Sequence, residues 1–211
     1  IQEQIDEVIY LTIMNENYPQ PAMPDGVEEG ILKGLYRLRK PMDGRRKPRV
    51  HLLGSGAILN EVLRAQRLLD ERFSIAADVW SVTSYQQLHR DALTVERWNR
   101  LHPDAETRTP YLLQGLEGAE GPFVAATDYL KLLPESIAGW LPGTLIALGS
   151  DGFGRSDGRE HLRAFFEVSA EHVALAALQA LAREGQLDNE TWKQALDELG
   201  IDPDKIDPAL S

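Results

Sequence analysis

The sequence predicts an α/β fold in three layers: a mostly parallel sheet of about five strands, with helices on both faces. Short β-prone apolar runs alternate along the chain with stretches whose apolar residues recur every three or four positions. Strands that are joined through helices run parallel, and a parallel sheet must be covered on both faces. The chain has 211 residues, of which 43% are hydrophobic and 26% charged, enough to bury a sizeable core.

The first 48 residues precede this alternation. An apolar run at Val8–Met14 predicts a buried strand, and three prolines between residues 19 and 24 favour an extended linker after it. Apolar residues at helical spacing predict a helix over residues 27–38. Because the chain starts with isoleucine rather than methionine and its first strand has no earlier partner strand, we expect a piece of a longer protein. The predicted division is a last strand of a preceding domain (residues 1–14), a proline-containing linker with one helix (15–48) and an α/β domain (49–211).

The alternating region contains five predicted strands, each an apolar run. They are Val50–Leu53, Ala76–Val82, Tyr111–Leu113, Phe123–Ala126 and Thr144–Leu148, and residues 165–168 form a shorter extended piece. Helices are predicted over residues 58–69, 85–93, 96–101, 130–140, 159–164, 170–183 and 190–199. Ser169 and Asp188 are the expected N-caps of the last two helices, and Gly185 and Gly200 are expected to end them.

The net charge is −11, from 22 basic and 33 acidic residues, so a protein that coats nucleic acid is excluded. Two segments depart from this average. Residues 37–49 carry seven basic residues and one acidic residue, most simply a solvated loop and alternatively a site for an anionic partner. Residues 186–211 carry seven acidic and two basic residues, most simply a solvated tail.

Several classes of site are excluded by what the sequence lacks. There is no cysteine, so disulfides and thiolate metal sites cannot form. The five histidines show neither H-E-x-x-H nor H-x-x-x-H spacing, so we expect no metal centre. No run of 18 apolar residues and no signal-peptide pattern is present, so we expect no transmembrane helix and a cytoplasmic location.

Two glycine motifs could carry chemistry. Gly54-Ser55-Gly56 lies between a predicted strand and a helix, where a phosphate can bind the helix N-terminus. The dinucleotide fingerprint needs a third glycine where Leu59 stands, so a tight strand–helix turn is the simpler interpretation.

The second motif, Gly154–Gly158, matches the G-x-S-x-G nucleophile elbow, with Ser156 as the nucleophile. The preceding strand ends near Leu148, several residues too early for such an elbow. A free-standing hydrolase that uses Ser156 is therefore a minor alternative. We expect instead that Ser156 or Asp157 caps the helix over residues 159–164.

Several blocks of the sequence resemble one family. Gly149–Glu160 resembles the G-x-D-G-F-G-x-S-D-x-R-E stretch near the C-terminus of homodimeric, bacterial-type pyruvate dehydrogenase E1 components. Asn15–Tyr18, followed by Pro21–Pro24, is similar to that family's N-E-N-Y…P-A-M-P linker. Further blocks follow in the family's order: Leu53–Gly56, Ser81–Ser84, Glu96–Asn99 and Thr127–Tyr129.

The resemblance implies a transketolase-like enzyme that depends on thiamine diphosphate and Mg²⁺. Such an enzyme decarboxylates pyruvate, the end product of glycolysis, and reductively acetylates the lipoyl group of its dihydrolipoyl acetyltransferase partner, E2. This chain would be the C-terminal domain of one subunit of an E1 homodimer. Residues 1–14 would then be the tail of the pyrimidine-binding domain.

Departures from the family's cofactor motifs limit what the resemblance implies for this chain. Thiamine diphosphate sites use a G-D-G motif followed by an Asn-Asn pair, but Ser150 precedes Asp151-Gly152 and no Asn-Asn pair occurs. The family's cofactor-activating glutamate would lie upstream of Ile1. We therefore expect no catalytic, cofactor-binding or metal-binding residue in the chain.

The expected role of the chain itself is to form interfaces. The candidate interface residues are Asp151, Phe153, Arg155, Ser156, Asp157 and Arg159, which follow the last predicted strand at the edge where sites and interfaces usually lie. We expect Arg155 and Arg159 to pair with acidic groups there. The alternative is a docking module that binds another component of the complex through the basic loop or the acidic tail.

Overall fold

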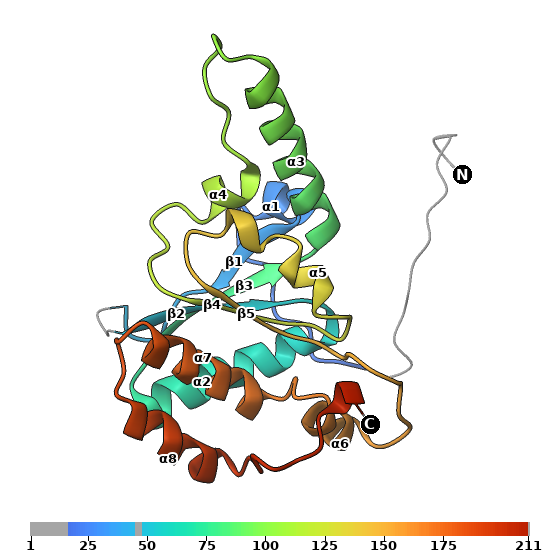
Figure 1. The fold of residues 1–211 in the computed structure, drawn as a ribbon, viewed down its shortest axis with the longest axis vertical. Coiled ribbons are helices and arrows are strands. Elements are labelled where there is room, and N and C mark those ends of the chain that lie inside the picture. Colours follow the sequence, from blue (N-terminus) through green and yellow to red (C-terminus); the bar gives the residue numbers. More distant parts are fainter. Residues whose placement is uncertain (1–16, 45–47, 211) are drawn as a thin grey trace.

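Within the described residues, five strands form a single sheet between two layers of helices (Figure 1). The computed structural model describes residues 17–44 and 48–210, so the predicted strand at Val8–Met14 lies outside the described residues. The strands are β1 (Leu35–Arg39), β2 (Arg49–Gly54), β3 (Ala76–Val82), β4 (Phe123–Ala126) and β5 (Leu145–Leu148). The predicted α/β architecture with a mostly parallel sheet is confirmed.

The strands lie in the order β1-β3-β2-β4-β5. β2 pairs in parallel with β3 and β4, and β4 pairs in parallel with β5, whereas β1 runs antiparallel to β3. The chain thus begins the parallel part in the middle of the sheet, adds β3 on one side and then crosses to the other side for β4. Such a switch point separates the loops that leave adjacent strands and opens a crevice at their carboxyl ends.

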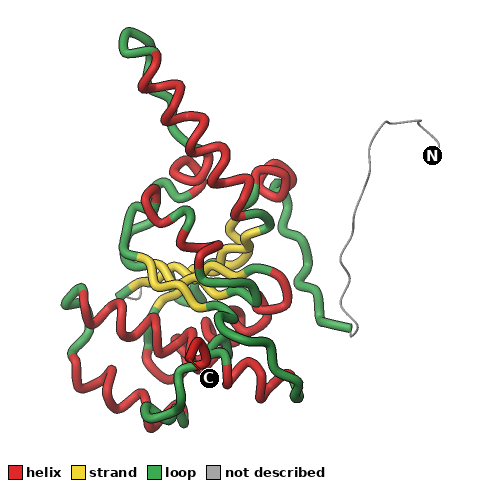
Figure 2. Tube along the Cα trace, turned by 45° about the vertical axis from the view of Figure 1, so that its right-hand side comes forward, coloured by secondary structure: helices red, strands yellow, loops and turns green. Residues whose placement is uncertain are grey.

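Helices cover both faces of the sheet (Figures 1 and 2). One face carries α2 (Leu59–Phe73), α7 (Ala170–Arg183) and α8 (Asn189–Leu199), with α6 (Arg159–Phe165) beside them. The other face carries α1 (Glu28–Lys33), α3 (Tyr85–Leu101), α4 (Tyr111–Gly115) and α5 (Leu132–Glu135). Short 3₁₀ turns occur at Gly56–Ile58, Ala138–Trp140 and Pro208–Leu210.

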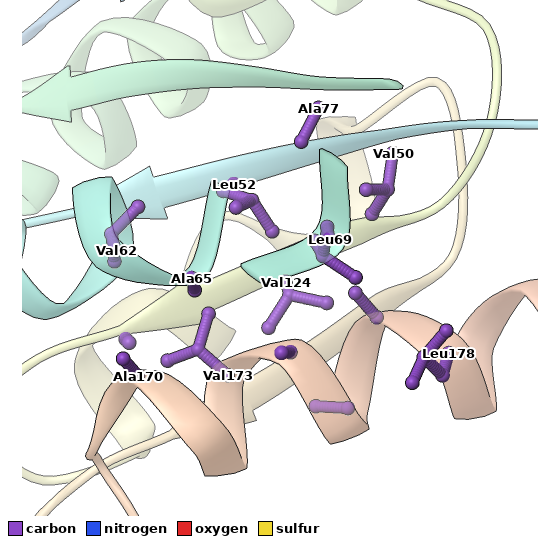
Figure 3. Packing of buried hydrophobic residues seen from close by; sticks show 14 of the residues in the cluster. Val50, Leu52, Val62, Ala65, Leu69, Ala77, Val124, Ala170, Val173 and Leu178 are labelled. Carbon is purple, nitrogen blue, oxygen red and sulfur yellow. The ribbon is translucent and has the colours of Figure 1, made fainter. Parts of the chain in front are cut away.

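Each face of the sheet has its own hydrophobic core. Figure 3 shows Leu52 and Val124 of the sheet packed against Val62 of α2 and Val173 of α7. Small residues such as Ala65 allow α2 and α7 to approach each other and the sheet closely. The opposite core contains three large buried aromatic side chains, Trp80, Tyr85 and Phe123.

The second half of α3 projects beyond the rest of the protein (Figure 1). Only Tyr85, Leu88 and Ala92 of this helix are buried. At its far end the rings of Trp98 and His102 stack 4.5 Å apart, and the Arg108 guanidinium carbon lies 3.6 Å from the Trp98 ring centroid. These contacts hold the returning loop against the helix.

The predicted helix over residues 27–38 is wrong in its second half. α1 ends at Lys33, and residues 35–39 form the antiparallel edge strand β1. The helix ends because Gly34 takes a positive φ of 106° and turns the chain toward β3. The apolar residues continued at helical spacing, so the pattern alone did not reveal this stop.

Three other local predictions need correction. Tyr111–Leu113 belongs to the helix α4 rather than to a strand, and the Asp91 carboxylate accepts a hydrogen bond from the Tyr111 amide at 2.7 Å. Residues 130–140 form two short pieces, α5 and a 3₁₀ turn, instead of one helix. Residues 165–168 are not extended, because α6 runs to Phe165 and Glu167 takes a positive φ of 59°. The helices predicted over residues 85–93 and 96–101 are both helical in the structure, but they form one continuous helix, α3.

The predicted helix caps are only partly correct. Asp188 caps α8 by accepting from the Thr191 amide at 2.7 Å, and Gly200 ends that helix in the left-handed conformation. Ser169 occupies the N-cap position of α7, but its hydroxyl contacts His172 Nδ1 at 2.9 Å instead of a backbone amide. Neither Ser156 nor Asp157 caps α6, whose N-cap residue is Gly158.

The basic tract over residues 37–49 is more than a solvated loop. Arg37 and Arg49 flank the buried carboxylate of Asp78, with nitrogen–oxygen distances of 3.5 and 3.8 Å. Trp80 Nε1 donates to Nδ1 of the adjacent His51 at 3.3 Å, so the neutral ring carries its proton on Nε2, beside the Glu120 carbonyl. Burial lowers the pKa of His51, and the Asp78 charge opposes this shift. Part of the tract therefore neutralises a buried acid.

One stretch, Arg159–Arg183, is long and apolar enough to cross a membrane by length and composition. In the structure it contains two helices, α6 and α7, and more than half of its most apolar window is buried inside the protein. α7 packs between α2 and α8 and against the sheet. A core helix of a folded domain accounts for this composition.

Two tyrosines in the core that contains Trp80 and Phe123 are expected to affect stability in opposite directions when each is replaced by phenylalanine. The Tyr85 hydroxyl is buried without a hydrogen-bond partner among the described residues, and burial raises its pKa. The Tyr111 hydroxyl donates to the Leu35 carbonyl at 3.0 Å. We expect Tyr85→Phe to raise the free energy of unfolding by about 1 kcal/mol and Tyr111→Phe to lower it by a similar amount. Urea unfolding of both variants measures this, and a destabilised Tyr85→Phe variant would contradict it.

Candidate interface at the carboxyl edge of the sheet

Three parallel strands end in register at one edge of the sheet. Gly54 pairs with Ala126, and Ala126 pairs with Leu148, so β2, β4 and β5 stop together. The loops that follow are bonded to one another. The Ser55 hydroxyl donates to the Thr127 hydroxyl at 2.8 Å, and the Ser150 amide donates to the Tyr129 carbonyl at 2.9 Å. These bonds make one connected surface from three separate loops.

The loop after β5 is held tightly by the loop after β4. Asp151 Oδ1 accepts from the Lys131 amide at 3.1 Å, and its other oxygen lies 3.8 Å from the Lys131 ammonium. Gly149 allows the close approach, because a Cβ there would lie 2.6 Å from the Tyr129 carbonyl oxygen. Gly152, with a φ of 89°, similarly faces the Pro208 carbonyl near the end of the chain. Gly149 and Gly152 therefore serve backbone packing.

Exposed apolar side chains stand on this rigid support. Phe153 is 82% exposed and Leu132 is 70% exposed, and Tyr129 and Leu130 beside them are exposed as well. A folded domain gains nothing by holding such side chains in water on loops that are fixed by hydrogen bonds. Exposed apolar groups on a rigid frame are typical of protein interfaces.

The predicted interface residues are thus brought to one edge, but their contacts differ from one to the next. Asp151 anchors the loop, whereas Phe153 points into solvent. Asp157 accepts from the Gly158 amide at 2.6 Å and lies 3.4 Å from His161. The Arg155 guanidinium lies 5.3 Å from the Phe165 ring centroid. Pairing of Arg155 and Arg159 with acidic groups of another domain remains a prediction.

Arg159 connects two sequence blocks that are far apart in the chain. Its guanidinium carbon lies 4.5 Å from the ring centroid of Tyr18, and that of Arg163 lies 5.7 Å from the same ring. We call these three residues the Tyr18 clamp. Cation–π contacts of this kind contribute about 0.5–1 kcal/mol each at exposed sites. The clamp fixes the extended segment around residue 18 to α6.

A pocket of about 220 Å³ adjoins the Tyr18 clamp at the switch point of the sheet, with Asp128 and Ser150 in its wall. The Asp128 carboxylate sits 3.2 Å from the position that a Cβ on Gly56 would occupy. Nearby protein atoms displace water from this carboxyl and raise its pKa, while the charge of Arg163 opposes the shift. Gly54-Ser55-Gly56 is therefore a close turn at the edge of this pocket.

Arg163 of the Tyr18 clamp is bonded to a buried carboxylate, that of Glu61, which no sequence motif marks. Glu61 of α2 is 2% exposed. Its Oε1 accepts from Arg163 at 2.7 Å, and its Oε2 accepts from Arg64 at 2.9 Å and from the Ala170 amide at 3.1 Å. Glu61 therefore caps α7 from a neighbouring helix and also orients Arg163. The sequence shows only a glutamate on an amphipathic helix, so no local pattern marks it.

The described residues contain no assembled hydrolase site at the G-x-S-x-G motif. Ser156 makes no side-chain hydrogen bond to a described residue, and His161 is exposed beside Asp157. Within the same residues, no group of three or more histidine, aspartate or glutamate side chains is placed to hold a metal ion.

Residues 34–169 match the family described as transketolase-like TK C-terminal domain. The chain belongs to this family. The match begins at Gly34, so this transketolase-like domain includes the edge strand β1, most of which falls within the helix predicted over residues 27–38. It ends at Ser169, so all of α7 and all of α8 lie beyond it.

Relatives of this transketolase-like chain cover its whole length. The pyruvate dehydrogenase E1 component of Pseudomonas aeruginosa is 51% identical over 209 residues, which are 99% of this chain and 24% of that protein. The protein of the same name from Escherichia coli K12 is 46% identical over 211 residues, 100% of this chain and 23% of that protein. The chain thus spans about a quarter of the length of these curated relatives.

A solved structure shares the fold. A transketolase from Leishmania mexicana superposes with a TM-score of 0.51 at 16% identity, over 78% of this chain and 21% of that one. At this identity the likeness concerns the architecture alone.

Proposed function

We propose that this chain is the C-terminal part of a pyruvate dehydrogenase E1 component and that its own role is structural. The whole protein would use thiamine diphosphate to decarboxylate pyruvate and would reductively acetylate the lipoyl group of E2 in the cytoplasm. The observation that carries this proposal is the 51% identity to a protein of that name over 99% of the chain. The carboxyl edge of the sheet would contact the rest of the E1 subunit or its partner in the homodimer.

The oxygen-bearing side chains of the described residues are not arranged to bind Mg²⁺ and thiamine diphosphate, which supports a role outside the reaction centre. Thiamine diphosphate with Mg²⁺ needs carboxylate and amide oxygens directed at one point. The Asp151 carboxylate is instead engaged by Lys131, and Ser150 replaces the first glycine of the cofactor motif. The described residues do not fit this group. We propose that the polypeptide preceding residue 15 supplies it, with residues 1–14 as the last strand of the pyrimidine-binding domain. Of the linker predicted over residues 15–48, the part before Gly34 would keep that role, because the matched domain begins at Gly34 and includes β1.

Calorimetric titration of the 211-residue chain tests this division of labour. We expect no saturable heat when thiamine diphosphate is added with Mg²⁺, because no described group is placed to hold the metal. The matched positive experiment uses the protein expressed with its upstream coding region, which should bind the cofactor and consume pyruvate. Micromolar binding to the 211-residue chain would contradict the proposed role.

The interface role is tested by Phe153→Ser in the full-length protein. Because Phe153 is exposed in the chain itself, its replacement should leave the stability of the isolated chain within about 0.5 kcal/mol. In the full-length protein we expect subunit or domain association to weaken by about 2 kcal/mol, the typical loss for a buried aromatic anchor. Analytical ultracentrifugation and proteolysis measure this loss.

Met42→Ser is the matched control, because Met42 is also an exposed apolar residue but lies in the loop after β1, away from this edge. Equal behaviour of the two variants in the full-length protein would remove the carboxyl edge as the interface.

A further inference from the structure

A basic pocket lies on the side of α2, where the linker crosses it. Its volume is about 370 Å³. Three guanidinium groups line it, from Arg39 at the end of β1 and from Arg64 and Arg67 on α2. The amide side chains of Gln20 and Asn60 complete its polar wall, and the remaining lining comes from two linker prolines and one leucine. No acidic side chain lines it.

The charge of this pocket is only partly compensated. Arg64 pairs with Glu61 at 2.9 Å and with Glu171 at 3.4 Å. Arg39 and Arg67 form no ion pair with a described residue. Two positive charges thus remain open in one pocket of a chain whose net charge is −11. General attraction of anions to this protein is unfavourable, so any anion affinity must be local.

The geometry suits a particular ligand chemistry. Arg64 and Arg67 are three residues apart on α2 and therefore lie on the same side of the helix. The ion pair with Glu61 restricts Arg64, so less side-chain freedom is lost on binding. Guanidinium groups bind oxyanions through paired N–H donors, and the two amides add further donors. Two uncompensated cations match the charge of a phosphate dianion.

We propose that this pocket binds a phosphate group of a small molecule. The two open guanidiniums would contact the phosphate oxygens, and the volume leaves room for the rest of a phosphorylated metabolite. The inference does not depend on the proposed function, because it uses only side chains of this chain and no feature of the carboxyl edge. It also gives Arg39, within the basic tract, a role that Arg37 and Arg49 do not share.

The test is calorimetric titration of the 211-residue chain with inorganic pyrophosphate at constant ionic strength. We expect saturable binding with a Kd of about 1 mM or tighter. The Arg39→Gln/Arg67→Gln variant should bind at least tenfold more weakly. The Arg90→Gln/Arg100→Gln variant removes the same charge from exposed positions on α3 and should bind as the wild type does.

Two further measurements control for unfolding of the double variant and for binding of any dianion. Arg67 is exposed on α2, so the single Arg67→Gln variant should fold normally and still bind at least threefold more weakly, even if the double variant is unstable. Malonate, a dicarboxylate dianion, should bind at least tenfold more weakly than pyrophosphate. The proposal is overturned if wild-type heats do not saturate, if both double variants lose affinity equally, or if malonate binds as well as pyrophosphate.

Discussion

Replacing Glu61 with alanine is expected to lower the free energy of unfolding by about 3–5 kcal/mol, the range for breaking a buried ion pair. Three groups would lose a bond to Glu61, and of these only Arg64 keeps another acid, Glu171. The Arg163 side chain is 16% exposed and bonds Glu61 at 2.7 Å, and the Ala170 amide at the start of α7 bonds it at 3.1 Å.

The glutamine variant separates the charge from the hydrogen bonds. Glu61→Gln keeps one oxygen that can accept from the Ala170 amide, so its loss should lie between wild type and Glu61→Ala. Glu71→Ala, on an exposed position of the same helix, should change stability by no more than about 0.5 kcal/mol. Denaturant unfolding of the three variants provides the comparison. A Glu61→Ala loss below about 1 kcal/mol would show that the buried pair is not a significant stabilising contact.

Loss of Glu61 should also affect the carboxyl edge. Without its carboxylate, Arg163 is free to adopt other rotamers, and the Tyr18 clamp loses one of its two cations. The Glu61 side chain therefore connects the start of α7, through the Ala170 amide, with the linker segment at Tyr18, through Arg163. Faster protease cleavage near residue 18 in Glu61→Gln, under conditions where the rest of the chain stays folded, would reveal this link.

Much of the fold follows from the sequence because its signals are local. β3 coincides with the predicted strand Ala76–Val82, and Asp188 caps α8 as the side-chain pattern indicated. These elements have strong patterns that no tertiary contact overrides. Tyr111–Leu113 has the residues of a strand, yet a bond from its first amide to Asp91, twenty residues earlier in the chain, favours a helix. A local pattern cannot contain that information.

The candidate site was predictable in its location and not in its chemistry. The carboxyl edge followed from the alternation of strands and helices, which predicts a parallel sheet, and from the place of the Asp151 motif after the last predicted strand. The Tyr18 clamp could not be foreseen, because nothing in the spacing of Tyr18 and Arg159 says that an extended segment returns to α6. Likewise, Arg37 and Arg49 read as part of a charged loop, since the buried Asp78 that they flank lies on a different strand.

Gly34 marks the point where the sequence pattern and the fold disagree, and it gives the second large prediction. We expect Gly34→Ala to lower the free energy of unfolding by about 3 kcal/mol or more, from backbone strain and a steric clash together. Its φ is 106°, and a Cβ there would lie 2.5 Å from the Ser84 carbonyl oxygen. The Gly34 carbonyl also accepts from the Thr83 amide at 3.0 Å, so the backbone cannot move away without loss.

Gly26→Ala is the matched control for this substitution. Gly26 also has a positive φ, of 74°, but nothing lies within 4 Å of the position that its Cβ would occupy. Its replacement should cost about 1 kcal/mol, the strain of the backbone alone. The difference between the two unfolding free energies then measures the contact between the α1–β1 junction and the end of β3. Equal losses would mean that the backbone at Ser84 moves away from the added Cβ at little cost. In that case β1 is held in the sheet by its pairing with β3 alone.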